Sequence, residues 1–291
     1  MSLTILLATR GRPDLCCETL EITLRNIALP STKLVVAMDK DDQQTVDKLS
    51  LFALDHPNIK LSVEQREDSL GEKYDRALRY PAQVYLPMVD YAPHVTPGFD
   101  AMICEAAALF PDNIGVVYNE LANASFPGIN GITHGLARKM GFIYPPWFPY
   151  WFVDHWLDDI ARMINRISFV DVRLDRLKRP GTQDCRDLKF WTILFDALHL
   201  RRRECAREII ESNDFIEPLW RKKLSLAHYP LIEFRSKWVN DSMRQDPKGI
   251  EAQGSKGIPD EDRYQRVKKR GVELLASLIP ELTAEEARKA A

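Results

Sequence analysis

The chain has 291 residues, a formal net charge of −2, 45% hydrophobic residues and 28% charged residues. These values are typical of a globular protein with one large domain or two small ones, and they argue against a protein that binds nucleic acid through its net charge. The five cysteines have no CxxC spacing, which favours reduced thiols in a cytoplasmic protein over disulfides or a zinc site. The first residues contain a short apolar run without a basic region before it, and no stretch has the length of a membrane span. We therefore expect neither a signal peptide nor a transmembrane segment.

Strands and helices are expected to alternate over the first 120 residues. Continuous apolar runs of strand length indicate strands that are buried on both faces. The expected strands are Leu3–Ala8, Lys33–Asp39, Ile59–Glu64, 84–90 and 114–118, and the expected helices are one capped by Asp14, then 42–55, 69–80 and 97–110. This alternation predicts an α/β fold with a mostly parallel sheet flanked by helices.

The pattern changes after residue 120. A Gly-rich segment at 126–141 is followed by an aromatic run at 144–152, YPPWFPYWF, and then by a helix that opens with Asp154. Three prolines in the aromatic run predict an irregular segment, because proline cannot donate to a strand ladder.

The last third of the chain has a helical pattern. Residues 185–226 are expected to form two or three helices and residues 267–290 a terminal amphipathic helix. Residues 244–262 contain two Pro and three Gly with few large apolar side chains, which indicates a mobile loop. The expected division is a unit of residues 1–180, with halves 1–120 and 121–180, and a helical C-terminal extension, 181–291.

Polar side chains stand at the carboxyl ends of the expected strands. They are Thr9 and Arg10 after the first strand, Asp39 at the end of the second, Arg66 after the third and Asp90 at the end of the fourth. Ligands of open α/β sheets bind outside the carboxyl ends of the strands. Because the parallel strands end at one edge of the sheet, these side chains predict a ligand site there.

Four motifs follow one another in this part of the chain: ILLATRGRP, VVAMDKDD, REDSLGEKYDRAL and YLPMVDYAPHVTPGFDAMI. Their order resembles the nucleotide-sugar-dependent glycosyltransferases of the GT-A fold, in particular glycosyltransferase family 2. The later segments PGINGITHGLARKMG and VDHWLDD resemble that family's acceptor side, where a Gly-rich stretch precedes an acidic catalytic base. The resemblance covers roughly residues 3–175. It implies a GT-A-like, Rossmann-related fold that transfers a sugar from a uridine or guanosine diphosphate sugar to a hydroxyl acceptor.

The resemblance places the nucleoside of the donor at the ends of the first two strands. It implies that Asp39 accepts hydrogen bonds from the base or the ribose, while Thr9 and Arg10 line the same pocket. From the residues alone, Asp41 or Asp42 could take the place of Asp39, and a solvated acidic loop is the ordinary alternative.

The leaving diphosphate needs positive charge, which a divalent cation or Arg and Lys can supply. Arg66 and Lys73 are the candidates among the basic residues, for contact with the diphosphate or the base, and a solvated side chain is the alternative for Lys73. Arg12 is expected to lie on the surface. The resemblance implies Mn²⁺ or Mg²⁺ at Asp90, the one residue here that matches the family's acidic motif; a strand-end Asp that caps the next turn is the alternative. Many relatives add a His after a later strand, where this chain has VRLDRLKRP and Asp175 is the nearest polar candidate.

Asp154 is the candidate catalytic base. A base for the acceptor hydroxyl is what an inverting displacement needs, so the resemblance implies inversion. Asp158 and Asp159 follow one turn later and compete for the role. Asp is also a favoured helix N-cap, which is the structural alternative for Asp154.

The aromatic run supplies the candidate acceptor-binding residues, Trp147, Tyr150 and Trp151. Aromatic faces pack against the C–H faces of sugars, but Trp and Tyr are equally common in cores and in oligomer contacts. Both interpretations stay open at this point.

Two other functions are compatible with the sequence. A nucleotidyltransferase on a related α/β sheet usually has a Gly-rich loop after the first strand, and TRGRP contains one Gly, which counts against it. A non-catalytic protein that binds a nucleotide or a partner is the second alternative.

For the glycosyltransferase, the expected partners are a nucleotide-diphosphate sugar and a hydroxyl acceptor, which is a glycan, a lipid or a small molecule. No nucleic acid is expected as a partner.

Overall fold

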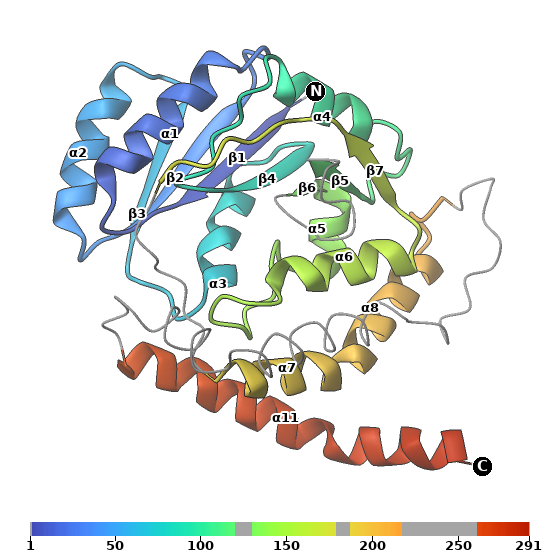
Figure 1. The fold of residues 1–291 in the computed structure, drawn as a ribbon. Coiled ribbons are helices and arrows are strands. Elements are labelled where there is room, and N and C mark those ends of the chain that lie inside the picture. Colours follow the sequence, from blue (N-terminus) through green and yellow to red (C-terminus); the bar gives the residue numbers. More distant parts are fainter. Residues whose placement is uncertain (1, 120–129, 179–186, 217–260, 291) are drawn as a thin grey trace.

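The computed structural model describes residues 2–119, 130–178, 187–216 and 261–290, and its centre is a seven-stranded sheet (Figure 1). The strand order is β3-β2-β1-β4-β6-β5-β7. The strands are β1 (Leu3–Ala8), β2 (Lys33–Asp39), β3 (Ile59–Glu64), β4 (Val84–Val89), β5 (Val116–Asn119), β6 (Asn130–Thr133) and β7 (Ile167–Val170).

The first four strands form a parallel core, as the apolar runs predict. β1 pairs in parallel with both β2 and β4, and β2 pairs in parallel with β3. Burial does not alternate along β1, because Ile5, Leu6 and Leu7 are all fully buried. Successive side chains of a strand point to opposite faces, so this burial means that both faces of the sheet are covered. The parallel pairing brings the ends of β1, β2 and β4 to the same edge of the sheet.

Among the described strands, β6 alone runs antiparallel to its neighbours, which are β4 and β5. It has four residues and includes Gly131, within the Gly-rich segment where the sequence indicates no strand. A strand this short offers no periodicity to detect. β5 is parallel to β7, and its carboxyl end lies at the same edge as that of β4 because both are antiparallel to β6.

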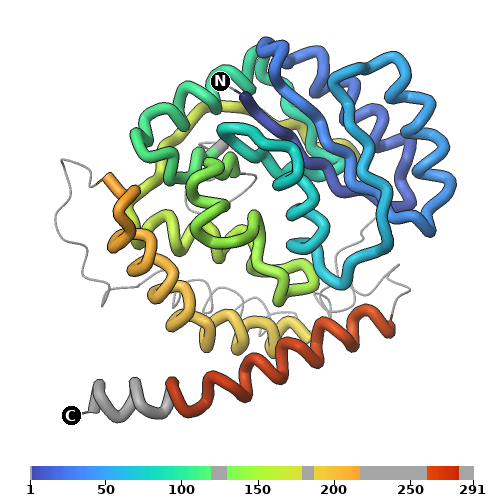
Figure 2. Tube along the Cα trace, turned by 180° about the vertical axis from the view of Figure 1, so that it is seen from behind, coloured from blue at the N-terminus to red at the C-terminus, as the bar shows by residue number. Residues whose placement is uncertain are grey.

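Helices cover both faces of the sheet (Figures 1 and 2). One hydrophobic cluster joins the sheet to α1 (Pro13–Arg25), α2 (Gln43–Leu54) and α4 (Phe99–Ala107). A second cluster, on the other face, joins it to α3 (Leu70–Tyr74), the 3-10 helix η1 (Asp75–Arg79), α5 (His134–Met140) and α6 (Val153–Met163).

The helix expected at 69–80 is divided between α3 and η1. Ser69 is the N-cap, and its Oγ accepts a hydrogen bond of 3.1 Å from the Glu72 N–H. The Glu72 carboxylate in turn accepts from the Ser69 N–H at 2.9 Å, which completes a capping box. The expected helix 97–110 is found as α4.

The C-terminal helices pack on the second face of the molecule. They are α7 (Leu188–Ala197), α8 (His199–Glu211) and α11 (Glu261–Ala290). Trp191 of α7, Ile209 of α8 and Val267 of α11 belong to the same hydrophobic cluster as Tyr85 of β4. The expected division near residue 180 stays a prediction. Of the segments expected as helices and as a loop, 217–226 and 244–260 lie outside the described residues, and Glu261 begins α11.

Within the described ranges, the helices do not include one that is both long and apolar enough to cross a membrane.

Candidate functional site

The loop after β1 holds the carboxylate at the end of β4. The hydroxyl of Thr9 donates a hydrogen bond of 2.8 Å to Asp90 Oδ2, and the guanidinium of Arg12 lies 2.9 Å from Asp90 Oδ1. Asp90 is 1% exposed and its backbone carbonyl accepts from the Thr19 hydroxyl at 2.9 Å. The neighbouring parallel strands β1 and β4 therefore present an ion pair at the predicted edge of the sheet. Arg12 is expected to lie on the surface, whereas its side chain is only 18% exposed and pairs with a buried carboxylate.

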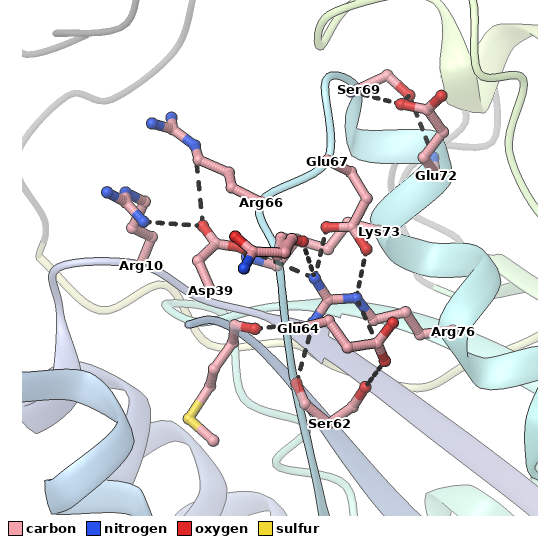
Figure 3. Close-up of polar contacts among 12 residues, drawn as sticks. Arg10, Asp39, Ser62, Glu64, Arg66, Glu67, Ser69, Glu72, Lys73 and Arg76 are labelled. Carbon is pink, nitrogen blue, oxygen red and sulfur yellow. Dashed lines mark hydrogen bonds and ion pairs between the residues drawn. The ribbon is translucent and has the colours of Figure 1, made fainter. Parts of the chain in front are cut away.

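Asp39 is the centre of a second cluster at this edge (Figure 3). Its Oδ1 lies 2.7 Å from Lys73 Nζ, and its Oδ2 lies 3.2 Å from the guanidinium of Arg10 and 3.8 Å from that of Arg66. Asp39 is 2% exposed, whereas the Arg10 side chain keeps 34% of its surface. The structure thus brings together four of the residues that the sequence predicts for donor binding.

Thr9 connects the two clusters. Its backbone carbonyl accepts a hydrogen bond of 3.2 Å from Lys73 Nζ, while its hydroxyl donates to Asp90. Burial lowers the pKa of Lys73, and the charge of Asp39 opposes that shift. Lys73 is therefore a buried cation between the first two strand ends, which differs from the solvated Lys common in the middle of a helix.

Arg76 is a buried residue of the site that the sequence analysis missed. It donates to the backbone carbonyls of Met38 at 2.7 Å and of Ser62 at 3.0 Å, and it pairs with the Glu67 carboxylate. It fixes the loop after β3, which carries Arg66, against the ends of β2 and β3. The available signal was its spacing, because Arg76 follows Lys73 by one helical turn and such residues share a face.

The residues around Asp90 do not fit a divalent cation as they stand. Mg²⁺ and Mn²⁺ take oxygen ligands, and both oxygens of Asp90 are already within contact of Thr9 and Arg12. Asp175 is exposed and its Oδ1 accepts from the Arg176 N–H. In the described part of the chain, no three His, Cys, Asp or Glu side chains are grouped so that they could hold a metal.

Asp154 lies in the first turn of α6. Two residues earlier, Phe152 adopts a left-handed backbone conformation with a φ of 72°, and the helix begins directly after it. The Asp154 Oδ1 accepts from the His155 N–H at 2.9 Å and lies 2.7 Å from His155 Nδ1. The Asp154 side chain is 27% exposed and that of His155 is 4% exposed, so the carboxylate faces outward from a buried imidazole.

The two competing carboxylates of α6 are in the interior. Asp158 is paired with Arg162 at 2.9 Å, and Asp159 is paired with Arg202 of α8 at 2.9 Å. Both are 0% exposed. Their position favours a structural role, and it leaves Asp154 as the acid of this helix that a substrate could reach.

The aromatic run is divided between the core and the surface. Phe148 and Phe152 are buried in the hydrophobic cluster of the second face. The predicted acceptor residues Trp147, Tyr150 and Trp151 are half-buried. Partly exposed aromatic rings that rest on buried side chains are compatible with a surface against which a sugar packs.

Two tyrosines join the run to the edge of the sheet. The Tyr74 hydroxyl donates to the Met88 carbonyl at 3.0 Å, two residues before Asp90, and the Tyr74 ring packs edge-on against Tyr144 at 5.3 Å. Burial, followed by the charge of Asp154, raises the pKa of Tyr144. Tyr74 and Tyr144 therefore link the end of β4, which precedes Asp90, to the aromatic run that precedes Asp154.

Comparisons with models of protein families and with curated proteins give no match. Similar solved structures include S. aureus TarS in complex with UDP-GlcNAc, with a TM-score of 0.53 and 13% identity over 98% of this chain and 92% of that chain. They also include the mannosyltransferase PcManGT from Pyrobaculum calidifontis in complex with GDP-Man and Mn²⁺, with a TM-score of 0.50 and 14% identity over 95% of this chain and 85% of that chain.

These structures define the class of fold. The chain has the GT-A fold, a mixed and mostly parallel sheet flanked by helices, and the expected resemblance to GT-A-type nucleotide-sugar glycosyltransferases is confirmed. At 13–14% identity the likeness concerns the fold, so the activity of this chain has to be argued from its own residues.

Proposed function

We propose that this protein is a glycosyltransferase that moves a sugar from a nucleotide-diphosphate sugar to a hydroxyl acceptor. The observation that carries the proposal is the pair of clusters at the carboxyl edge of the sheet. There Asp39 and Asp90 are each held by an arginine of the loop that follows β1. Nucleotide ligands of open α/β sheets bind at this edge.

The donor would lie across the two clusters. Asp39 and Arg10, with Arg66 beside them, form the nucleoside end, where a carboxylate accepts from a base or ribose and guanidinium groups stack or donate. Thr9 and Lys73 bridge this end to Asp90, where the diphosphate would lie.

A divalent cation at Asp90 is the expectation from the sequence. The PcManGT structure is a complex that contains Mn²⁺, which supports such a cation in a protein of similar fold. The ion pair of Asp90 with Arg12 supports the other possibility, in which basic side chains of the chain balance the diphosphate. Nucleotide titration with and without Mn²⁺ decides between the two.

The reaction would be a single displacement at the anomeric carbon. The Asp154 carboxylate takes the proton of the acceptor hydroxyl, the acceptor oxygen forms a bond to the anomeric carbon, and the bond from that carbon to the diphosphate oxygen breaks. The leaving nucleoside diphosphate keeps the electron pair. This is an inverting reaction, because one displacement reverses the configuration at the carbon.

The acceptor would lie against Trp147, Tyr150 and Trp151. Their half-buried rings alternate with the buried Phe148 and Phe152 and lie three to seven residues before Asp154 in the chain, which supports an acceptor held near the base. An acceptor bound on these rings also excludes water, which would otherwise hydrolyse the donor.

A panel of nucleotide sugars and three variants test the proposal. We expect one uridine or guanosine diphosphate sugar to stabilise the protein, by about 2.7 kcal/mol when the free ligand is at 100 times its Kd. Asp39→Ala should abolish this stabilisation. Asp154→Asn should keep it and lower kcat by about 10²–10⁴-fold, since a positioned base acts in the chemical step. Asp55→Asn, an exposed carboxylate after α2, is the control and should behave as the parent protein.

The results separate the alternatives. Binding without release of nucleoside diphosphate, with or without added Mn²⁺ and with every acceptor class, would favour a non-catalytic binding protein. Full transfer by Asp154→Asn would remove Asp154 as the base. Release of pyrophosphate from nucleoside triphosphates would favour the nucleotidyltransferase.

A further inference from the structure

Arg12 occupies the position at which a divalent cation would have to bind. Its guanidinium lies 2.9 Å from Asp90 Oδ1, and the other carboxylate oxygen accepts from Thr9 at 2.8 Å. Asp90 is 1% exposed, so the pair is enclosed by the protein on the side of the sheet. A cation that approached this carboxylate would meet the guanidinium as well.

The charge of Asp90 is balanced by the chain itself. The guanidinium of Arg12 carries a positive charge, so a divalent ion beside it would be repelled by Arg12 as well as attracted by Asp90. Mg²⁺ and Mn²⁺ bind at such sites through one or two carboxylates together with substrate phosphates and waters, so Asp90 would have to offer a free oxygen. In the ranges that the structure describes, no cluster of acids, His or Cys adds such ligands to Asp90.

Arg12 has the properties that a diphosphate requires. Its side chain is 18% exposed, so part of the residue that holds Asp90 lies at the surface. A guanidinium has five N–H donors in a fixed fork and can bond a carboxylate and phosphate oxygens at once. Arg12 is also the N-cap of the 13-residue helix α1, whose dipole adds positive potential at this end.

We propose that the Arg12 guanidinium neutralises the diphosphate of the donor in place of a divalent cation, so that donor binding by this chain does not require Mn²⁺ or Mg²⁺. Asp90 then serves to orient Arg12. The inference rests on the proposed function, and it concerns how the donor is held.

Calorimetric titration with UDP and with GDP, in excess EDTA and in excess Mn²⁺, tests it on the full chain. The parent protein should bind the nucleotide with the same Kd under both conditions. Arg12→Gln should weaken binding about 10- to 100-fold in EDTA, the range for a lost hydrogen bond to a charged group. Mn²⁺ should partly restore binding to this variant, because the carboxylate of Asp90 is released to act as a ligand.

Two further variants complete the design. In Arg12→Gln/Asp90→Asn both charges are absent, so the fold is spared a buried unpaired carboxylate and Mn²⁺ should no longer restore binding. Arg25→Gln removes an exposed arginine from the same helix, α1, and should bind as the parent protein does. Circular dichroism and thermal unfolding show which variants are folded.

Each result bears on one of the two proposals. If the parent protein binds the nucleotide with Mn²⁺ and not in EDTA, the inference about Arg12 is overturned and the proposed function stands. If folded Arg12→Gln and the double variant bind in EDTA as tightly as the parent protein, Arg12 is not the counter-charge. If neither nucleotide binds under either condition, the proposed function itself is wrong.

Discussion

Asp75 links the end of α3 to the residue that immediately precedes the aromatic run. It lies at the junction of α3 and η1, and its Oδ1 accepts a hydrogen bond of 2.7 Å from the Ile143 N–H. Burial raises the pKa of Asp75 to about 7; the Ile143 hydrogen bond opposes the rise, and the nearby Glu72 charge adds to it. The folded protein therefore holds a proton on Asp75 at pH values at which the unfolded chain has lost it.

The first prediction is a pH dependence of stability that belongs to Asp75. Between the unfolded value of 3.8 and the folded pKa of about 7, the native state binds more protons than the unfolded state. The free energy of unfolding therefore falls as the pH rises through this window. Asp75→Asn mimics the protonated form and keeps the acceptor for Ile143, so its stability relative to the parent protein should increase from pH 5 to pH 8.

Urea unfolding of both proteins across this range measures the difference directly. Burial also raises the pKa of Asp158, to about 6, but that contribution is common to both proteins and cancels in the comparison. A difference in unfolding free energy that does not change with pH would show that Asp75 does not titrate in this window.

At the scale of elements, α3 packs closely against the aromatic run, which carries the proposed acceptor residues. A Cβ atom on Gly71 would lie 2.6 Å from the Pro145 carbonyl oxygen and 2.7 Å from that of Tyr144. No side chain fits there, so the glycine is what lets the helix and the irregular run pack backbone against backbone.

The second prediction is that Gly71→Ala destabilises the protein in spite of a better helix propensity. Alanine is favoured over glycine inside a helix by about 1 kcal/mol. Overpacking of a closed contact costs about 1–3 kcal/mol, and here the neighbours are backbone atoms that cannot rotate away. We expect a net loss of on the order of 1–2 kcal/mol in denaturant unfolding. Glycosyl transfer should fall more than donor binding, because the aromatic run that carries the proposed acceptor residues is displaced.

Gly271→Ala in α11 is the matched control for this change. A Cβ atom there meets side-chain atoms of Trp191 and Leu194 at 3.1 and 3.2 Å, which can shift slightly. The gain in helix propensity should offset the cost of this small shift, so the stability of Gly271→Ala should stay close to that of the parent protein. Equal effects of the two substitutions would mean that the packing of α3 on the run is not specific.

The strand ends show what the sequence could predict. Continuous apolar runs mark β1, β2 and β4, and parallel strands must end at one edge, so Asp39 and Asp90 follow from the pattern. The partners of these acids do not follow from it. Arg12 reaches Asp90 only because β1 and β4 are neighbours in the sheet, and strand order is a tertiary property.

The acids of α6 show what could not be predicted from the local sequence. Asp154, Asp158 and Asp159 are equivalent as a pattern of residues on one helix. They differ because α8 covers the side of Asp159 with Arg202, a contact between segments far apart in the chain. Burial of charge depends on such partners, which local sequence does not specify.

At the scale of the whole molecule, α11 joins the C-terminal helices to the segment that carries Arg66. It packs along α7 (Figures 1 and 2), and its first turns reach the segment 64–72, which runs from the end of β3 into α3. Arg263 donates to the Glu67 carbonyl at 2.8 Å, Arg266 pairs with Asp68 at 2.8 Å, and Arg270 pairs with Glu72 at 2.8 Å. The segment that carries Arg66 is thus held from outside by three arginines of one helix.

The last prediction is that reversing two of these charges loosens the segment and weakens donor binding. In Arg266→Glu/Arg270→Glu, the new carboxylates face Asp68 and Glu72, so attraction becomes repulsion. Exposed ion pairs contribute about 0.2–1 kcal/mol each, so the loss of both corresponds to a Kd that rises about two- to thirtyfold when the segment must be ordered for binding. Amide exchange at 64–72 should become faster while exchange in β1 and β4 stays slow. High salt should reduce the difference from the parent protein, because it screens the repulsion.

The control Lys269→Glu/Arg207→Glu makes the same change in net charge at exposed positions whose observed ion pairs lie within their own helices. If the control weakens nucleotide binding as much as Arg266→Glu/Arg270→Glu does, net charge is the cause and α11 does not hold the segment in place.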